Sequence, residues 1–146
     1  MLDKSEKTIL YVDDEQENLD GFRFNFRKDY VIYTAQNTLE AFNIIRNAPI
    51  KVVISDNKMP DMLGTEFFEV LAVSNPDIIR ILVTAYADTE AAKQAINNGQ
   101  VYRFITKPWN KNELQNAIEN AFEAYQLKQQ NQQLIENLTK KNFELE

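Results

Sequence analysis

The fold is decided by the stretch Thr8-Ile9-Leu10-Tyr11-Val12-Asp13-Asp14, an apolar run closed by two acidic residues. A second run of the same kind ends on one carboxylate, Val52-Val53-Ile54-Ser55-Asp56. Such short continuous runs are typical of strands buried on both faces, as in a parallel sheet covered by helices on either side. The chemistry of these sheets lies just beyond the carboxyl ends of the strands. We therefore expect Asp13, Asp14 and Asp56 to meet at one edge.

The two runs belong to a longer alternation of strand-like and helix-like segments. Apolar or β-branched runs predict five strands, over residues 8–12, 30–35, 51–56, 78–84 and 101–106. A helical pattern follows each strand, and capping signals occur at Asn37 with Glu40, at Asp88, and at Asn110 with Glu113. Five βα units in a row predict an α/β protein with a doubly wound, mostly parallel five-stranded sheet and five helices. Spacing alone leaves the strand order open.

Composition narrows the class of protein. The 146 residues suit one domain with a moderate core, and 44% hydrophobic with 26% charged residues is ordinary for a soluble globular protein. A net charge of −6 argues against direct nucleic-acid binding, and no apolar stretch is long enough for a membrane span. Cysteine is absent and the first residues lack the apolar core of a signal peptide. The simplest interpretation is a cytoplasmic protein.

The chain has no histidine, which excludes imidazole general bases, Ser-His triads and imidazole metal ligands. Two further polar residues end predicted strands: Thr84 closes the fourth and Lys107 follows the fifth. Both should face the crevice that holds the three aspartates. Three carboxylates and one ammonium leave a formal charge of −2, which a single divalent cation would balance. Mg²⁺ suits such a site, because it prefers oxygen ligands.

A cation, a lysine and a hydroxyl are the usual set that stabilises a transferring phosphoryl group. Asp56 stands alone on its strand, whereas Asp13 and Asp14 form a natural cation cradle. We therefore interpret Asp56 as a nucleophile that becomes an acyl phosphate. Each residue taken singly has a simpler explanation, such as a helix-initiating acidic pair or ordinary turn chemistry at Asp56. These explanations weaken jointly, since four strand ends would have to carry complementary polar groups by accident.

Taken together, these residues make the sequence resemble the receiver domain of bacterial two-component response regulators. The matching motifs occur in the family's order and at its spacings: Val12-Asp13-Asp14-Glu15, Asp56 with Met59-Pro60 and Gly64, Thr84-Ala85, and Lys107-Pro108. The likeness covers roughly residues 6–126. We accordingly divide the chain into a receiver domain, residues 1–126, and an extension, residues 127–146.

The resemblance implies the flavodoxin-like strand order 2-1-3-4-5 and phosphorylation of Asp56 by a sensor histidine kinase. It implies Mg²⁺ held directly by Asp14 and Asp56, partly through water by Asp13, and by the main-chain carbonyl of Lys58. It also implies that Thr84 and Lys107 bind the phosphoryl oxygens, that Phe104 is a switch residue moving with Thr84, and that the Lys107–Pro108 bond is cis. Many relatives carry tyrosine at the position of Phe104. The implied module is a phosphoacceptor and not an enzyme, beyond self-phosphorylation and autodephosphorylation.

The C-terminal region differs from the rest, because residues 110–146 contain neither proline nor glycine. An uninterrupted helix of this length would span ~55 Å, more than one small sheet needs. Beyond residue 126, side chains at alternating steps of four and three predict a coiled-coil seam: Leu127, Asn131, Leu134, Leu138, Lys141 and Leu145. We expect a homodimer through this helix. The seam covers under three heptads, so a solvated linker helix is the alternative.

The leading hypothesis is a phosphorylation-controlled signalling module. It would relay the signal through the face of the fifth strand and last helix to a coiled-coil dimer, or to a C-terminal output domain missing from this chain. One alternative is a Mg²⁺-dependent phosphohydrolase with an aspartyl nucleophile. Such enzymes usually carry a second aspartate two residues after the first, where this chain has Lys58. The other alternative is a phosphorylation-independent scaffold with a vestigial site.

Overall fold

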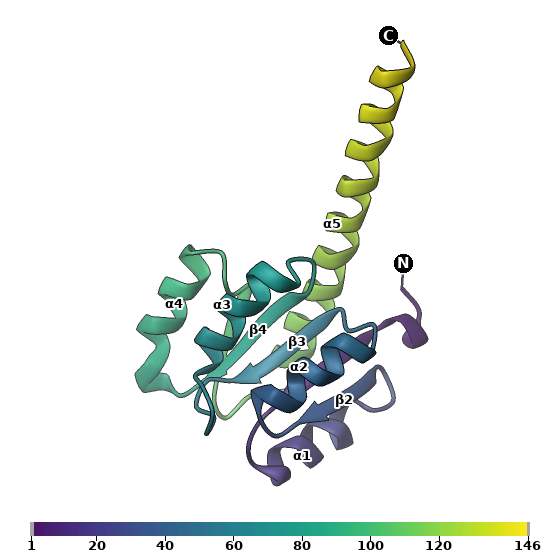
Figure 1. Cartoon of the computed structure of the whole chain (residues 1–146). Helices are drawn as coiled ribbons and strands as arrows, with labels where there is room; N and C mark the ends of the chain where they lie inside the picture. The colour runs from purple at the N-terminus through teal and green to yellow at the C-terminus, as the bar shows by residue number, and fades with distance from the viewer. Residues whose placement is uncertain (1, 146) are drawn as a thin grey trace.

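The computed structural model describes residues 2–145 of the chain, with side chains described through residue 142. Five parallel strands form one sheet in the order β2-β1-β3-β4-β5, with helices on both faces (Figure 1). The strands are β1 (Thr8–Val12), β2 (Val31–Ala35), β3 (Val52–Asp56), β4 (Ile79–Thr84) and β5 (Arg103–Thr106). The α-helices are α1 (Gln16–Phe26), α2 (Thr38–Asn47), α3 (Gly64–Ser74), α4 (Thr89–Asn97) and α5 (Lys111–Leu145). The predicted α/β class and the implied strand order are both confirmed.

Strands β1 and β3 lie at the centre of the sheet, and every residue in both is buried. They pair in parallel, with Leu10 opposite Val53 and Val12 opposite Ser55. Successive side chains of a strand point to opposite faces, so continuous apolar runs serve both layers of helices at once. This is the physical reason that residues 8–12 and 52–56 do not alternate between apolar and polar side chains.

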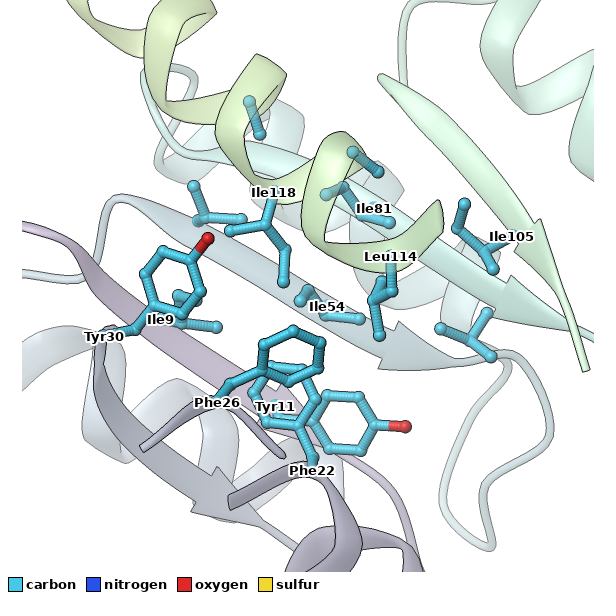
Figure 2. Close-up of a cluster of buried hydrophobic side chains, with 14 of the residues drawn as sticks. Ile9, Tyr11, Phe22, Phe26, Tyr30, Ile54, Ile81, Ile105, Leu114 and Ile118 are labelled. Carbon is cyan, nitrogen blue, oxygen red and sulfur yellow. The ribbon is translucent and has the colours of Figure 1, made fainter. Parts of the chain in front are cut away.

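One face of the sheet is covered by α1 and α5, and its core is rich in aromatic rings (Figure 2). Tyr11 of β1 stacks on Phe22 of α1 with ring centroids 4.2 Å apart. Trp109, which precedes α5, contacts Phe22 and Phe26 with centroid distances of 6.4 and 5.9 Å. Trp109 is therefore a packing residue that closes the end of this core.

The opposite face is covered by α2, α3 and α4. Helix α3 contributes Phe67, Phe68 and Leu71, all fully buried, against strand residues such as Leu82. Helix α4 buries only two small residues, Ala92 and Ala95, and adds the partly buried Ile96 at its end. Since a large buried side chain contributes roughly 1.5–3 kcal/mol and alanine much less, α4 is the helix least firmly held by apolar burial.

The helix starts agree with the predicted caps at two of three positions. Asn37 accepts a hydrogen bond from the Glu40 amide at 2.9 Å, and Asn110 accepts from the Glu113 amide at 3.2 Å. Asp88 occupies the N-cap position of α4, but its side chain makes no cap hydrogen bond. Asp88 thus lies at the predicted N-cap position of α4, but the prediction that its side chain caps the helix is wrong.

Helix α5 is continuous for 35 residues and projects beyond the sheet (Figure 1). Its projecting part carries Leu127, Leu134 and Leu138 with 60%, 57% and 55% of their surface exposed. The side chain of Leu145, the last seam position, lies outside the described part. A continuous helix is confirmed, while the coiled coil and the division at residue 126 stay predictions. Within residues 2–145, no helix combines the length and the apolar character that crossing a membrane requires.

Candidate functional site

The parallel sheet brings the three predicted aspartates together. Asp13 and Asp14 follow β1 directly, and Asp56 is the last residue of the neighbouring strand β3. One carboxylate oxygen from each of Asp13, Asp14 and Asp56 lies within 4.8 Å of the other two. This is the separation at which a single cation can touch more than one carboxylate. The predicted cluster at the carboxyl edge is therefore present.

Asp13 is fully buried, and its two oxygens are both occupied. Oδ1 accepts a hydrogen bond from the Glu15 amide and Oδ2 from Asn18 Nδ2, each at 3.0 Å. Burial raises the pKa of Asp13; the Glu15 amide opposes that shift, whereas the negative charge of Asp56 adds to it. Asp14, in contrast, is exposed at the rim. The site thus pairs one desolvated carboxylate with one that water reaches.

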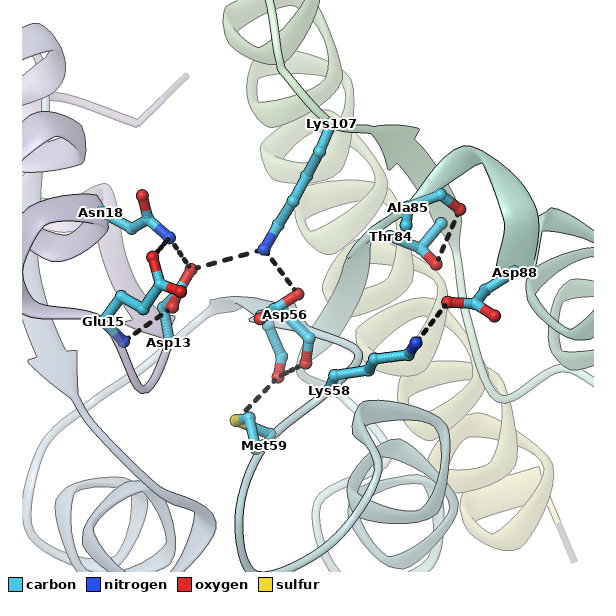
Figure 3. Close-up of polar contacts among 11 residues, drawn as sticks. Asp13, Glu15, Asn18, Asp56, Lys58, Met59, Thr84, Ala85, Asp88 and Lys107 are labelled. Atoms are coloured by element: carbon cyan, nitrogen blue, oxygen red, sulfur yellow. Dashed lines mark hydrogen bonds and ion pairs between the residues drawn. The ribbon is translucent and has the colours of Figure 1, made fainter.

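Lys107 approaches the cluster from the end of β5 (Figure 3). Its Nζ lies 2.9 Å from Asp56 Oδ1 and 3.9 Å from Asp13 Oδ2. Its amide donates to the Thr84 carbonyl at 2.9 Å, which ties it to the end of β4, and the following peptide bond to Pro108 is cis. One ammonium against three carboxylates leaves an excess of two negative charges, as the sequence predicts. Such a donor set fits a divalent cation of the magnesium type.

An open cavity of about 300 Å³ lies over the cluster. Its lining consists of Asp14, Glu15, Asp56, Asn57, Lys58, Ala85, Asp88 and Lys107. Ala85 leaves room that a larger side chain would fill. The cavity is polar and reaches Asp56, so it suits a small charged group rather than an apolar ligand.

Thr84 and Phe104 lie where the sequence places them, on β4 and β5. Thr84 is fully buried, and its hydroxyl makes one long contact of 3.4 Å to the Ala85 carbonyl. Phe104 pairs with Leu82 in the sheet register and packs, partly buried, against the core under α2, α3 and α4. Thr84 directly precedes Ala85, which lines the cavity, and the roles of Thr84 and Phe104 stay predictions.

The loop after β3 is held against the sheet by Gly64. The Gly64 amide donates to the Asn57 carbonyl at 2.7 Å. A Cβ at position 64 would lie only 2.6 Å from the Asp56 carbonyl oxygen and 2.9 Å from Leu82 Cδ1. Glycine is therefore required by this close approach, and it fixes the backbone that carries Asp56 and Lys58.

The sequence assigned no site role to three residues that shape the site: Glu15 and Asn18, which bond to Asp13, and Asp88, which pairs with Lys58. Lys58 Nζ lies 3.6 Å from Asp88 Oδ2, an ion pair that joins the loop after β3 to the segment before α4. The available signal was position, since Asn18 follows the acidic pair by one helical turn and Asp88 follows Thr84 by four residues. Neither position reveals which way the side chain points.

The family model for the response regulator receiver domain matches residues 9–119, so the chain belongs to this family. Its members are phosphoacceptor signalling modules phosphorylated by histidine kinases, and they are not catalytic enzymes. The pocket of Asp13, Asp14 and Asp56 is typical of phosphoaspartate response regulators.

Relatives and solved structures agree with this assignment. The hydrogenase transcriptional regulatory protein HoxA of Cupriavidus necator is 32% identical over 124 residues, which is 85% of this chain and 26% of that protein. A structure titled adenylate cyclase from Rhodopirellula baltica matches with a TM-score of 0.86 and 29% identity, covering 92% of this chain and 98% of that one. The beryllofluoride-activated NtrC4 receiver domain dimer matches with a TM-score of 0.76 and 30% identity over 82% and 98%. The chain spans about a quarter of the length of the first curated relatives it matches.

Proposed function

We propose that this chain is the receiver of a two-component phosphorelay and that Asp56 accepts a phosphoryl group from a sensor histidine kinase in a Mg²⁺-dependent reaction. The observation that carries the proposal is the contact of Lys107 Nζ with Asp56 Oδ1 at 2.9 Å, inside a cluster of three carboxylates. A structural ion pair needs one carboxylate and not three. Because the kinase draws its phosphoryl group from ATP, we place the module in the cytoplasm.

The transfer is a substitution at phosphorus. A carboxylate oxygen of Asp56 attacks the phosphohistidine of the kinase, an O–P bond forms, the P–N bond breaks, and its electron pair returns to the imidazole. The product is an acyl phosphate on Asp56. Lys107 lies close enough to neutralise the phosphoryl oxygens, and the Thr84 hydroxyl has only one weak contact to give up in order to donate to them.

Asp13, Asp14, Asp56 and the main-chain carbonyl of Lys58 would hold Mg²⁺. The ion supplies charge neutralisation for the phosphoryl oxygens when it is bound. The fit rests on the donor set, which consists of hard oxygen atoms with excess negative charge. The hydrogen bonds from Glu15 and Asn18 fix the orientation of the Asp13 carboxylate before any ion arrives.

The signal would leave the site through Thr84, Phe104 and the face of β5 and α5. Phe104 shares the core under α4, the helix that is least firmly held by apolar burial. The continuity of α5 and its exposed leucines support relay to a coiled-coil dimer. The length of the curated relatives supports the other possibility, an output domain that follows α5.

The phosphohydrolase alternative requires a general acid two residues after Asp56. Lys58 occupies that position, and its ammonium is paired with Asp88 rather than directed at a leaving group. This contact favours the receiver over the hydrolase. Turnover of a phosphomonoester at enzymatic rates would reverse that preference.

A titration with beryllofluoride, a mimic of the phosphoryl group, tests the proposal. Trp109 is the single tryptophan and lies two residues from Lys107, so its fluorescence reports events at the site. We expect a saturable change that requires Mg²⁺ and disappears in Asp56→Asn. An equal response in Asp56→Asn, or a response without Mg²⁺, would contradict the assignment of Asp56.

A further inference from the structure

Lys58 and Asp88, which both line the cavity over Asp56, form an ion pair with each other (Figure 3). Lys58 belongs to the loop after β3, and Asp88 ends the short 3-10 turn Tyr86–Asp88 that leads into α4. The two charged atoms lie 3.6 Å apart, which is an ion-pair distance and longer than a hydrogen bond. The contact therefore joins the segment that carries Asp56 to the segment that positions α4.

The two partners are unequally solvated. The Lys58 side chain is 73% exposed, whereas that of Asp88 is 29% exposed. Asp88 Oδ2 is buried and accepts no hydrogen bond among the residues that the structure describes. A buried carboxylate oxygen without a hydrogen bond is costly, so the Lys58 ammonium is its principal compensation. Asp88 depends on this contact more than Lys58 does.

We propose that this pair is a charge-exchange latch: the Lys58 ammonium neutralises Asp88 in the unphosphorylated protein and moves to the phosphoryl group once Asp56 carries it. This inference rests on the proposed function of Asp56. Lys58, Asp56 and Asp88 line the same cavity, so the ammonium exchanges partners by rotating its side chain. Asp88 is thereby a positioning residue, because it acts through Lys58.

The direction of the exchange follows from charge. Phosphorylation replaces the single charge of Asp56 by about two negative charges spread over three phosphoryl oxygens. A flexible lysine is a mobile point charge and pairs more strongly with such a dianion than with one carboxylate. Lys107 is already engaged by Asp56 and Asp13, which leaves Lys58 as the second lysine lining the cavity.

The exchange would leave Asp88 without its cation at the start of α4. The buried residues of α4 are two alanines, its one larger core contact is the partly buried Ile96 near its far end, and its N-cap side chain makes no cap hydrogen bond. The start of α4 is therefore held by few apolar contacts that would oppose a shift of this segment. Loss of the Lys58 contact therefore favours a new position of the turn Tyr86–Asp88 and of α4. This route to α4 runs over the surface of the cavity, separately from Thr84 and Phe104.

A double-mutant cycle tests the latch with beryllofluoride at saturating Mg²⁺ as the probe. We expect Asp88→Asn to tighten beryllofluoride binding roughly two- to fivefold, because Lys58 no longer has a partner to leave. Lys58→Gln should weaken binding by at least the same factor. In the Lys58→Gln background, Asp88→Asn should have no further effect. A matched cycle on the exposed pair Lys93–Glu90 of α4, at 3.5 Å, should leave the affinity unchanged.

Two results would overturn the latch alone. If Asp88→Asn tightened binding equally with and without Lys58, Asp88 would simply repel the anion. If Lys58→Gln left the affinity unchanged, the ammonium would not move. Wild-type protein that bound no beryllofluoride at all would overturn the proposed function and the latch together. Circular dichroism of each variant confirms that it is folded.

Discussion

At the scale of single residues, the site concentrates negative charge that the fold alone does not require. Two carboxylates ~4 Å apart repel each other by ~4 kcal/mol at an effective dielectric near 20. Asp13 carries an additional cost because it is fully buried. Lys107 offsets part of this repulsion through Asp56 and, at 3.9 Å, through Asp13. A bound cation would offset the rest.

Replacement of Asp13 by asparagine should separate the destabilising effect of the buried charge from the stabilising effect of a bound cation. In the presence of a chelator, we expect Asp13→Asn to raise the free energy of unfolding by ~1 kcal/mol, because it removes a buried charge that repels Asp56. Millimolar Mg²⁺ should stabilise the wild type through binding and should give the variant a smaller increment, because one of the three carboxylates is lost. Thermal unfolding measures both effects, with Asp20→Asn on the exposed side of α1 as the control. A Mg²⁺ increment in Asp13→Asn as large as in the wild type would contradict a role for Asp13 in holding the metal.

Gly64 provides a test of the backbone that carries Asp56. We expect Gly64→Ala to lower the free energy of unfolding by ~1–3 kcal/mol, because its Cβ would lie 2.6 Å from the Asp56 carbonyl oxygen. Gly21→Ala in α1 is a matched control: its Cβ meets nothing within 4 Å, and alanine favours a helix by ~0.5–1 kcal/mol. Urea unfolding measures both variants. A Gly64→Ala protein as stable as the wild type would show that the loop adapts.

The sequence predicted Asp13, Asp14, Asp56, Thr84 and Lys107 because each ends a strand of a parallel sheet, where position alone determines the neighbourhood. It missed Asn18 and the Lys58–Asp88 contact for a different reason. Their roles depend on side-chain direction across loops, and no periodic pattern encodes that direction. The prediction for Asp88 shows the limit well, since the residue lies at the expected cap position and its side chain points elsewhere.

At the scale of secondary-structure elements, the sequence predicted which strands and helices exist more accurately than it predicted where each begins. Four predicted strands begin one or two residues before the observed ones, because residues such as Tyr30 and Ile78 bond to preceding turns: their amides donate to Phe26 and Asn75 carbonyls. The cap of α2 has a local part and a distant part. Asn37 is local and was predicted, whereas Asp61 reaches the Thr38 amide from the loop after β3, at 3.0 Å. A contact across 23 residues leaves no sequence signal.

Glu119 links α5 to the amino end of the sheet and gives a pH prediction. Burial disfavours its carboxylate, but hydrogen bonds from Tyr30 and Lys7, at 2.6 and 2.9 Å, outweigh that cost and lower the pKa of Glu119 below 4.5. A lowered folded-state pKa stabilises the protein above the unfolded-state value, and that stabilisation is lost as the pH falls through the folded-state value.

We therefore expect Glu119→Gln to be ~0.5 kcal/mol less stable than the wild type at pH 7, a small effect because the side chain is 44% exposed and water screens it. The difference should shrink toward zero as the pH is lowered below 4.5. Urea unfolding at several pH values measures it, with Glu123→Gln on the exposed side of α5 as the control. A difference that stayed constant with pH would argue against a role for the charge.

At the scale of the whole molecule, the C-terminal part of α5 projects from the domain with leucines exposed to solvent. The base of this projecting part contacts the loop before β4: Lys128 donates a hydrogen bond to the Pro76 carbonyl, and Gln132 donates one to Asp77 at 3.0 Å. Beyond these contacts the seam leucines are more than half exposed. Asn131 lies within the seam between Leu127 and Leu134, and a polar residue at such a position commonly specifies register and oligomeric state.

If the seam forms a coiled coil, Leu134→Asp should weaken dimerisation at least tenfold, because two carboxylates would face each other in an apolar interface. Gln133→Asp, one position away on the polar side, should leave it unchanged. Sedimentation equilibrium measures the mass, and we expect twice the monomer mass for the wild type with Mg²⁺ and beryllofluoride. A wild-type protein that is monomeric with and without beryllofluoride would contradict the dimer.

The sequence predicted the α/β class from alternation alone, but strand order came only from the resemblance to the receiver family. Spacing cannot choose an order, because several right-handed wirings bury the same strands equally well. The continuous α5 followed from the lack of proline and glycine. Whether α5 pairs with a second copy could not be predicted from the sequence, since a seam of under three heptads fits both a short coiled coil and a solvated helix.

The central claim is that Asp56 is a covalent phosphoacceptor, and intact mass spectrometry after incubation with acetyl phosphate and Mg²⁺ tests it most directly. We predict that the wild-type protein gains the mass of one phosphoryl group, that a chelator prevents the gain, and that Asp56→Ala shows none. An unmodified wild-type protein, or a phosphoryl group retained by Asp56→Ala, would contradict the claim.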